Sequence, residues 1–317
     1  MRFHALDIAK FVACLFIISL HVGTYPELGR EFSDVINISG RWAVPFFFLL
    51  SGYFYGKSDK NVAYKLSKLI GVFLIACAVY FFVLISQLDY NFEAVIKTAL
   101  SIKFFMSGTY FHLWFLCAII YGYLGVAYFN EKKSGVLPLA LALSLLLCCW
   151  FFDMLRSRGL AFEAFYVFRT LTAFSMLWAG MLIARHNKVL SFKVSLFICA
   201  ISYALMLAEP LFLKYFMGFN VNERQFPLFA PVMSYGILML CLSINVNESF
   251  FSRLGRELSL GVYIIHPVWI YVIYEMFKRM DINNSSMMFF SVATATILTL
   301  IALKRYAKYF FKKLNGY

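Results

Sequence analysis

Charged side chains are scarce in this chain. They make up 14% of its 317 residues, against about 25% in a typical soluble domain. Hydrophobic residues make up 62% of the chain, and the mean hydropathy is +0.76. Because a soluble fold needs polar side chains to cover its surface, this composition excludes an ordinary soluble protein. The apolar segments are therefore expected to face lipid, which predicts an integral membrane protein.

The chain also lacks the sequence patterns of a metal site. Its five histidines form no HExxH-like pair, and its seven cysteines all lie in apolar runs without a CxxC or Cys/His spacing. Cysteines in such runs are typically small buried hydrophobic side chains. We therefore predict that the protein binds no metal ion.

No repeat, low-complexity tract or long linker divides the chain, which predicts a single domain over residues 1–317 with no appended soluble domain. A membrane-spanning helix needs about 20 apolar residues. About ten segments meet or approach this length, so we predict an all-α polytopic membrane protein with about ten transmembrane helices. The amphipathic segment 91–107 is expected to lie at the membrane interface. The predicted spans cover residues 5–23, 41–56, 67–86, 112–129, 136–152, 168–185, 190–212, 227–245, 259–277 and 285–303.

The distribution of basic residues predicts the topology. If both termini are cytoplasmic, the cytoplasmic face carries the entire formal net charge of +13 and the outer face is neutral. Such a face suits anionic lipid or a polyphosphorylated ligand, so the excess charge indicates topology rather than nucleic-acid binding. Lys10 interrupts the first apolar run, which favours a retained first span over a cleaved signal peptide.

The first span carries ionisable residues at helical spacing. On a helix, Asp7, Lys10, Cys14 and His21 fall within a stripe about 60° wide, which is expected to line a path from the inner to the outer side. Asp7 and Lys10 can pair, whereas His21 lies about 21 Å farther along the helix. Ionisable groups within spans are costly and therefore indicate functional sites. His21 is either a packed core residue or a reactive group at the outer aqueous boundary, where it can exchange protons.

The ninth span, "LSLGVYIIHPVWIYVI", carries a second polar face. Tyr263 and His266 share this face, and Pro267 removes a backbone hydrogen bond beside them. An interhelical hydrogen bond and a direct chemical role both remain open for His266. The segment "TYFHLWFLCAII" begins the fourth span, and His112 in it fits an interfacial aromatic belt.

The second span and the start of the third supply further candidates. Arg41 begins the second span from the outside, and Ser51 lies near its inner end beside Gly52, which permits close approach of a helix or a ligand. Lys65 and Lys68 are spaced i,i+3 and present two ammonium groups together. Such a pair suits phosphate recognition, although ordinary cytoplasmic lysines explain it equally well.

Together these stretches resemble the integral-membrane acyltransferase 3 family, in its polysaccharide O-acetyltransferase branch. The resemblance rests on "LDIAKFVACLFIISLH", "RWAVPFFFLLSGYF", "KLSKLI", "FHLWFL" and "SLGVYIIHP", which occur in the family's order between residues 6 and 267. It implies a ten-helix protein of the bacterial cytoplasmic (inner) membrane. Such a protein transfers an acyl group, usually acetyl, from cytoplasmic acyl-CoA to a hydroxyl of a cell-envelope glycan or a lipid-linked sugar.

The resemblance also implies roles for individual residues. It makes His21 the essential group, as general base or as nucleophile, with Asp7 and Arg41 beside it as catalytic candidates. Lys10, Lys65 and Lys68 are then expected to bind acetyl-CoA, the donor co-substrate. The family usually has arginine at these three positions, and lysine keeps the charge but loses the bidentate fork. His266, Tyr263 and Ser51 are further candidates.

Two other classes of function fit the layout of spans. A transporter or flippase for a glycan or its lipid-linked precursor would also need many spans with buried ionisable residues. Such carriers often show internal repeats and mid-span carboxylates, and neither is evident here. A structural or assembly subunit without chemistry would leave the stripe on the first span unexplained.

Overall fold

Helices account for 83% of the computed structural model. The structure describes residues 3–58, 61–131, 135–160 and 162–315, and this part of the chain contains no strand. The predicted all-α class is therefore confirmed. The predicted domain limits at residues 1 and 317 lie outside the described residues.

The described residues contain nine helices that are long and apolar enough to cross a membrane. Nine of the ten predicted spans coincide with them. The eighth, predicted over residues 227–245, forms a helix of only 14 residues, Ala230–Ser243, which is about 21 Å long against a hydrocarbon core of about 30 Å. The nine candidate spans are His4–Val22, Arg30–Gly56, Val62–Gln87, Phe111–Asn130, Val136–Ser157, Ala164–His186, Phe192–Met217, Phe250–Arg279 and Ser285–Tyr306.

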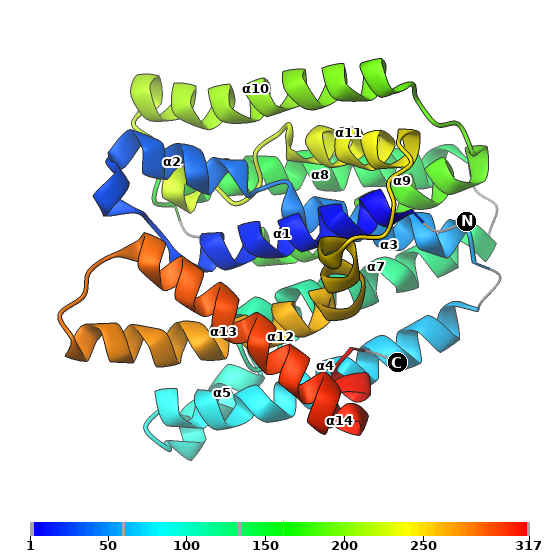
Figure 1. Ribbon diagram of the computed structural model, residues 1–317. Helices are drawn as coiled ribbons and strands as arrows, with labels where there is room; N and C mark the ends of the chain where they lie inside the picture. Colours follow the sequence, from blue (N-terminus) through cyan, green and yellow to red (C-terminus); the bar gives the residue numbers. More distant parts are fainter. Residues whose placement is uncertain (1–2, 59–60, 132–134, 161, 316–317) are drawn as a thin grey trace. The chain divides into compact units, whose positions relative to one another are not determined.

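The chain divides into two compact units. The single domain stays a prediction. Of the described residues, unit 1 comprises 3–47 and 188–315, and unit 2 comprises 48–58, 61–131, 135–160 and 162–187. One boundary falls inside helix α3 (Ala43–Gly56), and the other falls after residue 187, in the connection between α9 (Ala164–His186) and α10 (Phe192–Met217). Unit 1 contains α1 (His4–Val22), η1 (Pro26–Leu28), α2 (Arg30–Ser39), α10 (Phe192–Met217), η3 (Val221–Glu223), α11 (Ala230–Ser243), α12 (Phe250–Arg279), α13 (Ser285–Tyr306) and α14 (Lys308–Leu314) (Figure 1).

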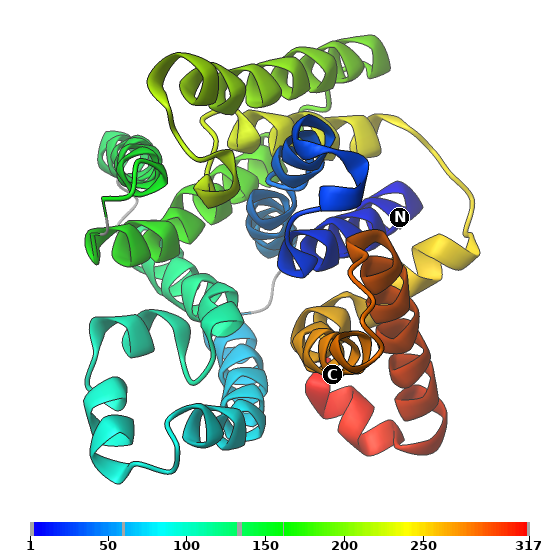
Figure 2. The ribbon, with the colours of Figure 1, turned by 90° about the vertical axis from the view of Figure 1, so that its left-hand side faces the viewer.

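Within unit 1, α1 and α12 run parallel, and α13 packs against both (Figures 1 and 2). Near the start of α1, the backbone of Asp7 meets Gly255 at the start of α12. Near the end of α1, the ring of His21 faces His266, farther along α12. The side chain of α1 residue Cys14 lies between these two contacts and donates to the carbonyl of Ser259 at 3.7 Å.

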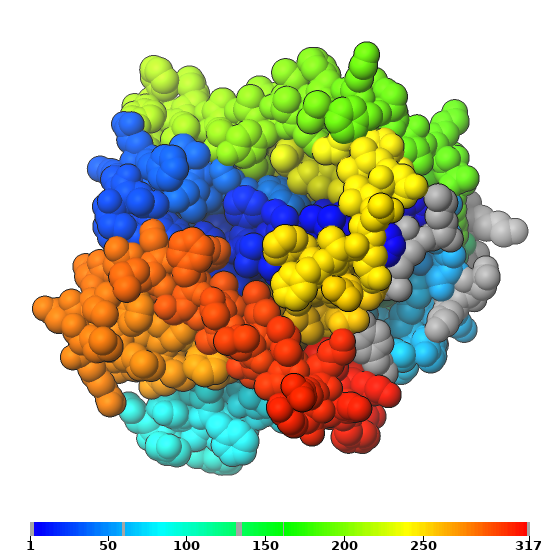
Figure 3. All heavy atoms as spheres, viewed as in Figure 1, coloured from blue at the N-terminus to red at the C-terminus, as the bar shows by residue number. Residues whose placement is uncertain are grey.

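Helix α13 runs in the opposite direction. Its first turn is bound by Glu27, which follows the end of α1, and its last turn is bound by Glu257, near the start of α12. The first helix therefore begins, and the last candidate span ends, at the same end of unit 1. We call this the Asp7 end, and the opposite one the His21 end. In Figure 3, α1 (dark blue) shows only in part because neighbouring helices of unit 1 cover it.

The short α11 runs antiparallel to α10. Leu228, two residues before α11, donates from its backbone to Glu209 in the second half of α10, whereas Gly236 packs on Cys199 in the first third of α10. Helix α11 connects α10 to α12, and its antiparallel direction is the one expected of the eighth predicted span. Its length is shorter than that prediction. Which side of the membrane holds the termini stays a prediction.

Unit 2 contains the rest of α3 with α4 (Val62–Gln87), α5 (Phe92–Ala99), α6 (Ile102–Ser107), η2 (Phe111–Leu113), α7 (Trp114–Glu131), α8 (Val136–Ser157) and α9 (Ala164–His186). Its helices α3 and α9 touch through their backbones. A Cβ atom on Gly52 would lie 2.0 Å from the carbonyl oxygen of Leu177, and one on Gly180 would lie 2.0 Å from that of Leu49. The close approach expected at Gly52 is thus made by a helix.

Candidate functional site

The predicted ionisable pair on α1 forms at the Asp7 end. Nζ of Lys10 lies 2.6 Å from Oδ1 of Asp7, and the two side chains are 16% and 8% exposed. Because this i,i+3 pair lies in a largely apolar environment, removing either partner would leave an uncompensated charge near the start of α1. Further cations gather around the same end, from α12 and from the end of α13 into α14: Arg253, Arg256, Lys304, Arg305 and Lys308.

The stripe on α1 faces α12. Asp7 and Cys14 are buried, and both meet the N-terminal half of α12 through the contacts described above. The prediction of one polar face is therefore confirmed. Along its first half this face forms a seam between α1 and α12. The path from the inner to the outer side stays a prediction.

The seam ends at two imidazoles. The rings of His21 and His266 have centroids 5.1 Å apart and are tilted by 39°. His266 has no solvent-exposed surface, and its Nδ1 lies 2.8 Å from the carbonyl oxygen of Val262, one turn earlier in α12. Tyr263 packs beside it, with ring centroids 6.5 Å apart. The structure thus joins three of the residues singled out from sequence.

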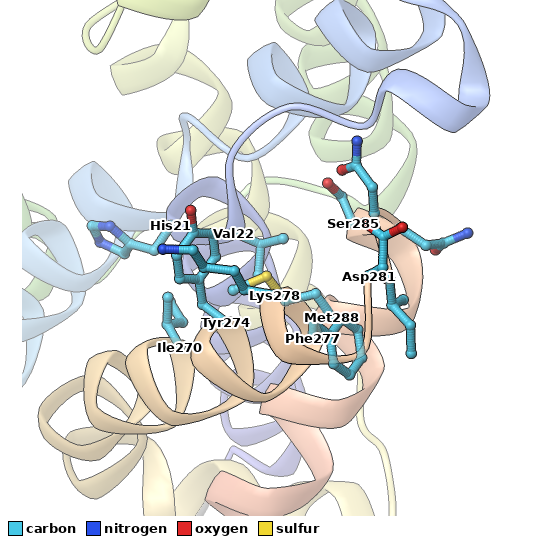
Figure 4. Close-up of a pocket in the computed structure, with 12 residues that line it drawn as sticks. His21, Val22, Ile270, Tyr274, Phe277, Lys278, Asp281, Ser285 and Met288 are labelled. Carbon is cyan, nitrogen blue, oxygen red and sulfur yellow. The ribbon is translucent and has the colours of Figure 1, made fainter.

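A pocket of about 530 Å³ lies at the His21 end of unit 1 (Figure 4). His21, Val22 and Ile270 form part of its wall, and most other lining residues come from the end of α12 and the start of α13. In Figure 4 the Tyr274 hydroxyl and the Lys278 ammonium point toward the side on which His21 lies. The remaining lining residues are Phe277, Asp281, Ile282, Asn283, Asn284, Ser285 and Met288.

The pocket therefore offers one cation, one carboxylate, two amides and hydroxyl groups next to an imidazole. Sequence reasoning missed these residues, because they lie at the end of one apolar helix, in the turn that follows and at the start of the next helix, where they resemble an ordinary polar connection. The available signal was the run "KRMDINNSS" directly after the predicted ninth span, which places several hydrogen-bonding side chains in a short connection.

Glu27 connects the segment after α1 to the start of α13 at the His21 end. Its Oε1 accepts hydrogen bonds from the backbone N–H and the hydroxyl of Ser286, at 2.6 and 2.7 Å. Burial acts to raise the pKa of Glu27, but these hydrogen bonds outweigh it and hold the pKa below the ordinary value. The carboxylate consequently stays ionised and fixes the start of α13, which carries the pocket residue Ser285.

Arg41 also belongs to unit 1, at the turn between α2 and α3. Its guanidinium donates to the side chain of Asn37 and, at 3.4 Å, to the carbonyl of Asn222. The adjacent Gly40 packs against Leu20, which directly precedes His21. Arg41 therefore lies at the His21 end, and its contacts with Asn37 and Asn222 join α2 to η3. Its catalytic role stays a prediction.

The two predicted phosphate-binding lysines and Ser51 lie in unit 2. Lys65 donates to the carbonyl of Phe54 at 3.3 Å and sits 4.9 Å from the centre of the Tyr55 ring. Lys68 sits 4.8 Å from the centre of the Tyr64 ring. Each ammonium group is thus held by an aromatic face, a contact worth about 0.5–1 kcal/mol at exposed sites. The Ser51 carbonyl accepts from the Tyr123 hydroxyl at 3.2 Å.

Unit 2 also contains a buried polar cluster that the sequence did not indicate. The Arg169 guanidinium lies 4.3 Å from the centre of the Trp114 ring, and Tyr166 also packs on it. His112 is fully buried, with its ring centroid 4.5 Å from that of Tyr80. The aromatic-belt interpretation of His112 was therefore wrong, because its ring packs inside the protein.

Comparisons with known proteins agree with the resemblance seen in the sequence. A family model described as an acyltransferase domain matches residues 3–305, and so runs through both units. An amino-acid racemase of Enterococcus faecalis is 25% identical over 95% of this chain and 46% of that protein. A serine/alanine racemase of Enterococcus gallinarum is 23% identical over 96% of this chain and 46% of that protein. The chain thus spans about half the length of these curated relatives. No solved structure matches it.

Proposed function

Because the chain belongs to the acyltransferase family whose domain model matches residues 3–305, we propose that it moves an acetyl or other acyl group from acyl-CoA to a hydroxyl acceptor. The acceptor is a cell-envelope glycan or a lipid-linked sugar, and the protein acts in the bacterial cytoplasmic membrane with its Asp7 end facing the cytoplasm. The cations gathered at this end support that orientation, since cytoplasmic loops carry an excess of lysine and arginine.

One observation carries the proposal. His21 stands at the wall of a polar-lined pocket, while its own helix begins at a buried ion pair about 21 Å away. An imidazole beside a pocket can exchange protons with a bound hydroxyl group at neutral pH, because its ordinary pKa lies near 6.5. The packed seam between α1 and α12 holds the backbone of His21 in place.

The proposed reaction has two forms. As a general base, His21 takes the proton of the acceptor hydroxyl while its oxygen attacks the thioester carbonyl; the C–S bond then breaks, and the CoA thiolate regains the proton from His21. As a nucleophile, a His21 nitrogen attacks the thioester carbonyl and the C–S bond breaks, so that His21 carries the acyl group and CoA leaves as the thiolate. The acceptor oxygen then takes the acyl group as the C–N bond breaks, and the hydroxyl proton passes through the freed imidazole to the CoA thiolate. In both forms one ester is made and one thioester is broken.

For the donor, we propose that the nucleotide phosphates of acyl-CoA bind basic groups on the cytoplasmic side, with Lys65 and Lys68 among them. When the donor binds, the two ammonium groups leave the rings of Tyr55 and Tyr64 and contact phosphate oxygens instead. Lys10 is a weaker candidate, because Asp7 already neutralises it. For the acceptor, we propose the pocket beside His21, whose amide, carboxylate and ammonium groups suit a hydroxyl-rich ring.

The racemase names belong to proteins of which this chain matches less than half, so the proposed reaction follows the family model. We nevertheless propose to test free serine as an acceptor, since its name appears in that of one relative. Its hydroxyl, like that of a sugar, can accept an acyl group to form an ester.

The test uses purified protein in liposomes with acetyl-CoA labelled in the acetyl group. Label is expected on an envelope glycan or lipid-linked sugar, and His21→Ala is expected to abolish it while the protein still elutes as a single species. Crossing of glycan without acetyl transfer to any acceptor would establish the transporter alternative. Retained transfer by His21→Ala would remove His21 from the mechanism.

A further inference from the structure

Three helices of unit 2 end at the place where a fourth begins. Helix α3 ends beside α9, because a Cβ atom on Gly56 would lie 2.7 Å from that of Ala184. Helix α9 ends beside α7, since the Arg185 guanidinium donates to the Asn130 side chain at 2.6 Å. Helix α4 begins beside the end of α3, as the hydrogen bond from Lys65 to the α3 backbone shows. The four helix ends therefore form one surface of unit 2.

Two cations at this surface are held by amide oxygens. Nζ of Lys57, the residue after α3, lies 2.6 Å from Oδ1 of Asn187, the residue after α9. Arg185, in the last turn of α9, donates in the same way to Oδ1 of Asn130. Both cations are exposed. Because an amide oxygen is neutral, each contact orients its cation without cancelling the charge.

The surface keeps an excess of positive charge. Lys65 and Lys68 add two ammonium groups, each against an aromatic ring. The C-terminal ends of three helices contribute about half a negative charge each, which attracts cations but does not balance four of them. By sequence, the adjoining segments 58–60 and 131–134 add three lysines and two acids, so the excess remains. Such a surface suits a ligand with several phosphate groups.

From these contacts we infer that Lys57 and Arg185 form a second phosphate subsite next to Lys65 and Lys68. Arg185 supplies what the three lysines lack, a planar guanidinium that binds a phosphate through two parallel hydrogen bonds. Acyl-CoA carries phosphate at two places, as a diphosphate and as a separate monophosphate on the ribose. Two neighbouring subsites hold both, so the protein selects a CoA thioester over donors that lack one or both of these groups. The assignment to CoA rests on the proposed function, whereas the positive surface does not.

The subsite is tested by binding of three ligands without acyl transfer. These are CoA, dephospho-CoA, which lacks the ribose monophosphate, and pantetheine, which lacks all phosphate. Isothermal titration of the full chain in phosphatidylcholine nanodiscs gives the Kd of each ligand. Arg185→Gln removes the charge, whereas Arg185→Lys keeps the charge and loses the fork. The matched control is Lys97→Gln, which removes an exposed cation from α5, beyond the opposite end of α4.

We expect Arg185→Gln and Lys57→Gln each to raise the Kd for CoA about 5- to 10-fold, and Arg185→Lys to raise it less, since each change weakens a charge-assisted contact with phosphate. Pantetheine binding should stay unchanged in every variant. The control should bind all three ligands like the wild type. The preference for CoA over dephospho-CoA should disappear when the pair that holds the ribose monophosphate is replaced by glutamine, either Lys57 with Arg185 or Lys65 with Lys68.

An unchanged Kd for CoA in both Arg185→Gln and Lys57→Gln would overturn the subsite, and so would an unchanged preference for CoA in both double variants. A second arm adds phosphatidylglycerol to the nanodiscs. If the two single variants lose stabilisation by this lipid while CoA binding stays at the wild-type level, the surface binds an acidic lipid headgroup and the inference fails. If the wild type binds CoA as expected but transfers no acetyl group, the proposed function fails and the subsite stands.

Discussion

Replacing Gly255 by alanine tests the seam on which the site depends. A Cβ atom at this position would lie 1.8 Å from the carbonyl oxygen of Asp7 and 2.9 Å from the backbone nitrogen of Phe11. Both neighbours are backbone atoms of α1, so no side-chain rotation relieves the overlap. Restoring an ordinary contact requires α1 and α12 to separate by roughly 1.5 Å at this point.

The cost follows from this separation. Forcing an extra methyl group into a packed interface destabilises a protein by about 1–3 kcal/mol, and helix propensity returns at most about 1 kcal/mol when glycine becomes alanine. A separation that propagates to the His21 end also moves His21 relative to His266. Because a misplacement of about 1 Å can cost about 10²-fold in rate, acetyl transfer should fall more than stability does.

The matched control is Gly71→Ala in α4, where a Cβ atom meets nothing within 4 Å. Thermal denaturation of the detergent-purified variants and labelled acetyl transfer in liposomes measure the two effects. We expect Gly255→Ala to melt at lower temperature and to transfer acetyl poorly, and Gly71→Ala to match the wild type or exceed its stability slightly. Equal melting of Gly255→Ala and wild type would refute the direct contact between α1 and α12.

Two further predictions concern the donor and the pocket. Replacing both Lys65 and Lys68 by alanine should raise the KM for acetyl-CoA with little change in kcat. Replacing both by arginine should lower this KM, since the guanidinium fork binds phosphate bidentately. The same KM in the wild type and in both double variants would remove the two lysines from donor binding. Glu27 has a lowered pKa, so its hydrogen bonds with Ser286 stabilise the fold above pH 4.5 and are lost as the pH falls through the folded-state pKa. Between pH 6 and 3.5 the melting temperature of the wild type should therefore fall more than that of Glu27→Gln. The difference should be small because the carboxylate is solvated. Parallel curves of melting temperature against pH would show that the contact between Glu27 and Ser286 contributes nothing to stability.

The sequence predicted the helices well because lipid-facing segments must be apolar and about 20 residues long. It also predicted that Asp7, Lys10 and His21 share one face, since helical geometry alone decides that. It did not reveal that this face packs on α12 through Gly255, because helix pairing depends on contacts between residues some 250 positions apart. The pocket residues Lys278 and Asp281 were not predicted for a related reason. Their polar segment becomes a candidate site only because the fold places it next to His21.

The parallel seam between α1 and α12 has a consequence for biosynthesis. The two halves of the candidate site come from residues 4–22 and from residues 250–306, so the first helix enters the membrane long before its partner is made. Until then the backbone that Gly255 later covers, beside the Asp7–Lys10 ion pair, stays open to lipid or to neighbouring helices. Ribosome-bound chains ending near residue 243 should therefore hold α1 accessible to cross-linking from its His21 face, and that access should close once α12 and α13 have been inserted.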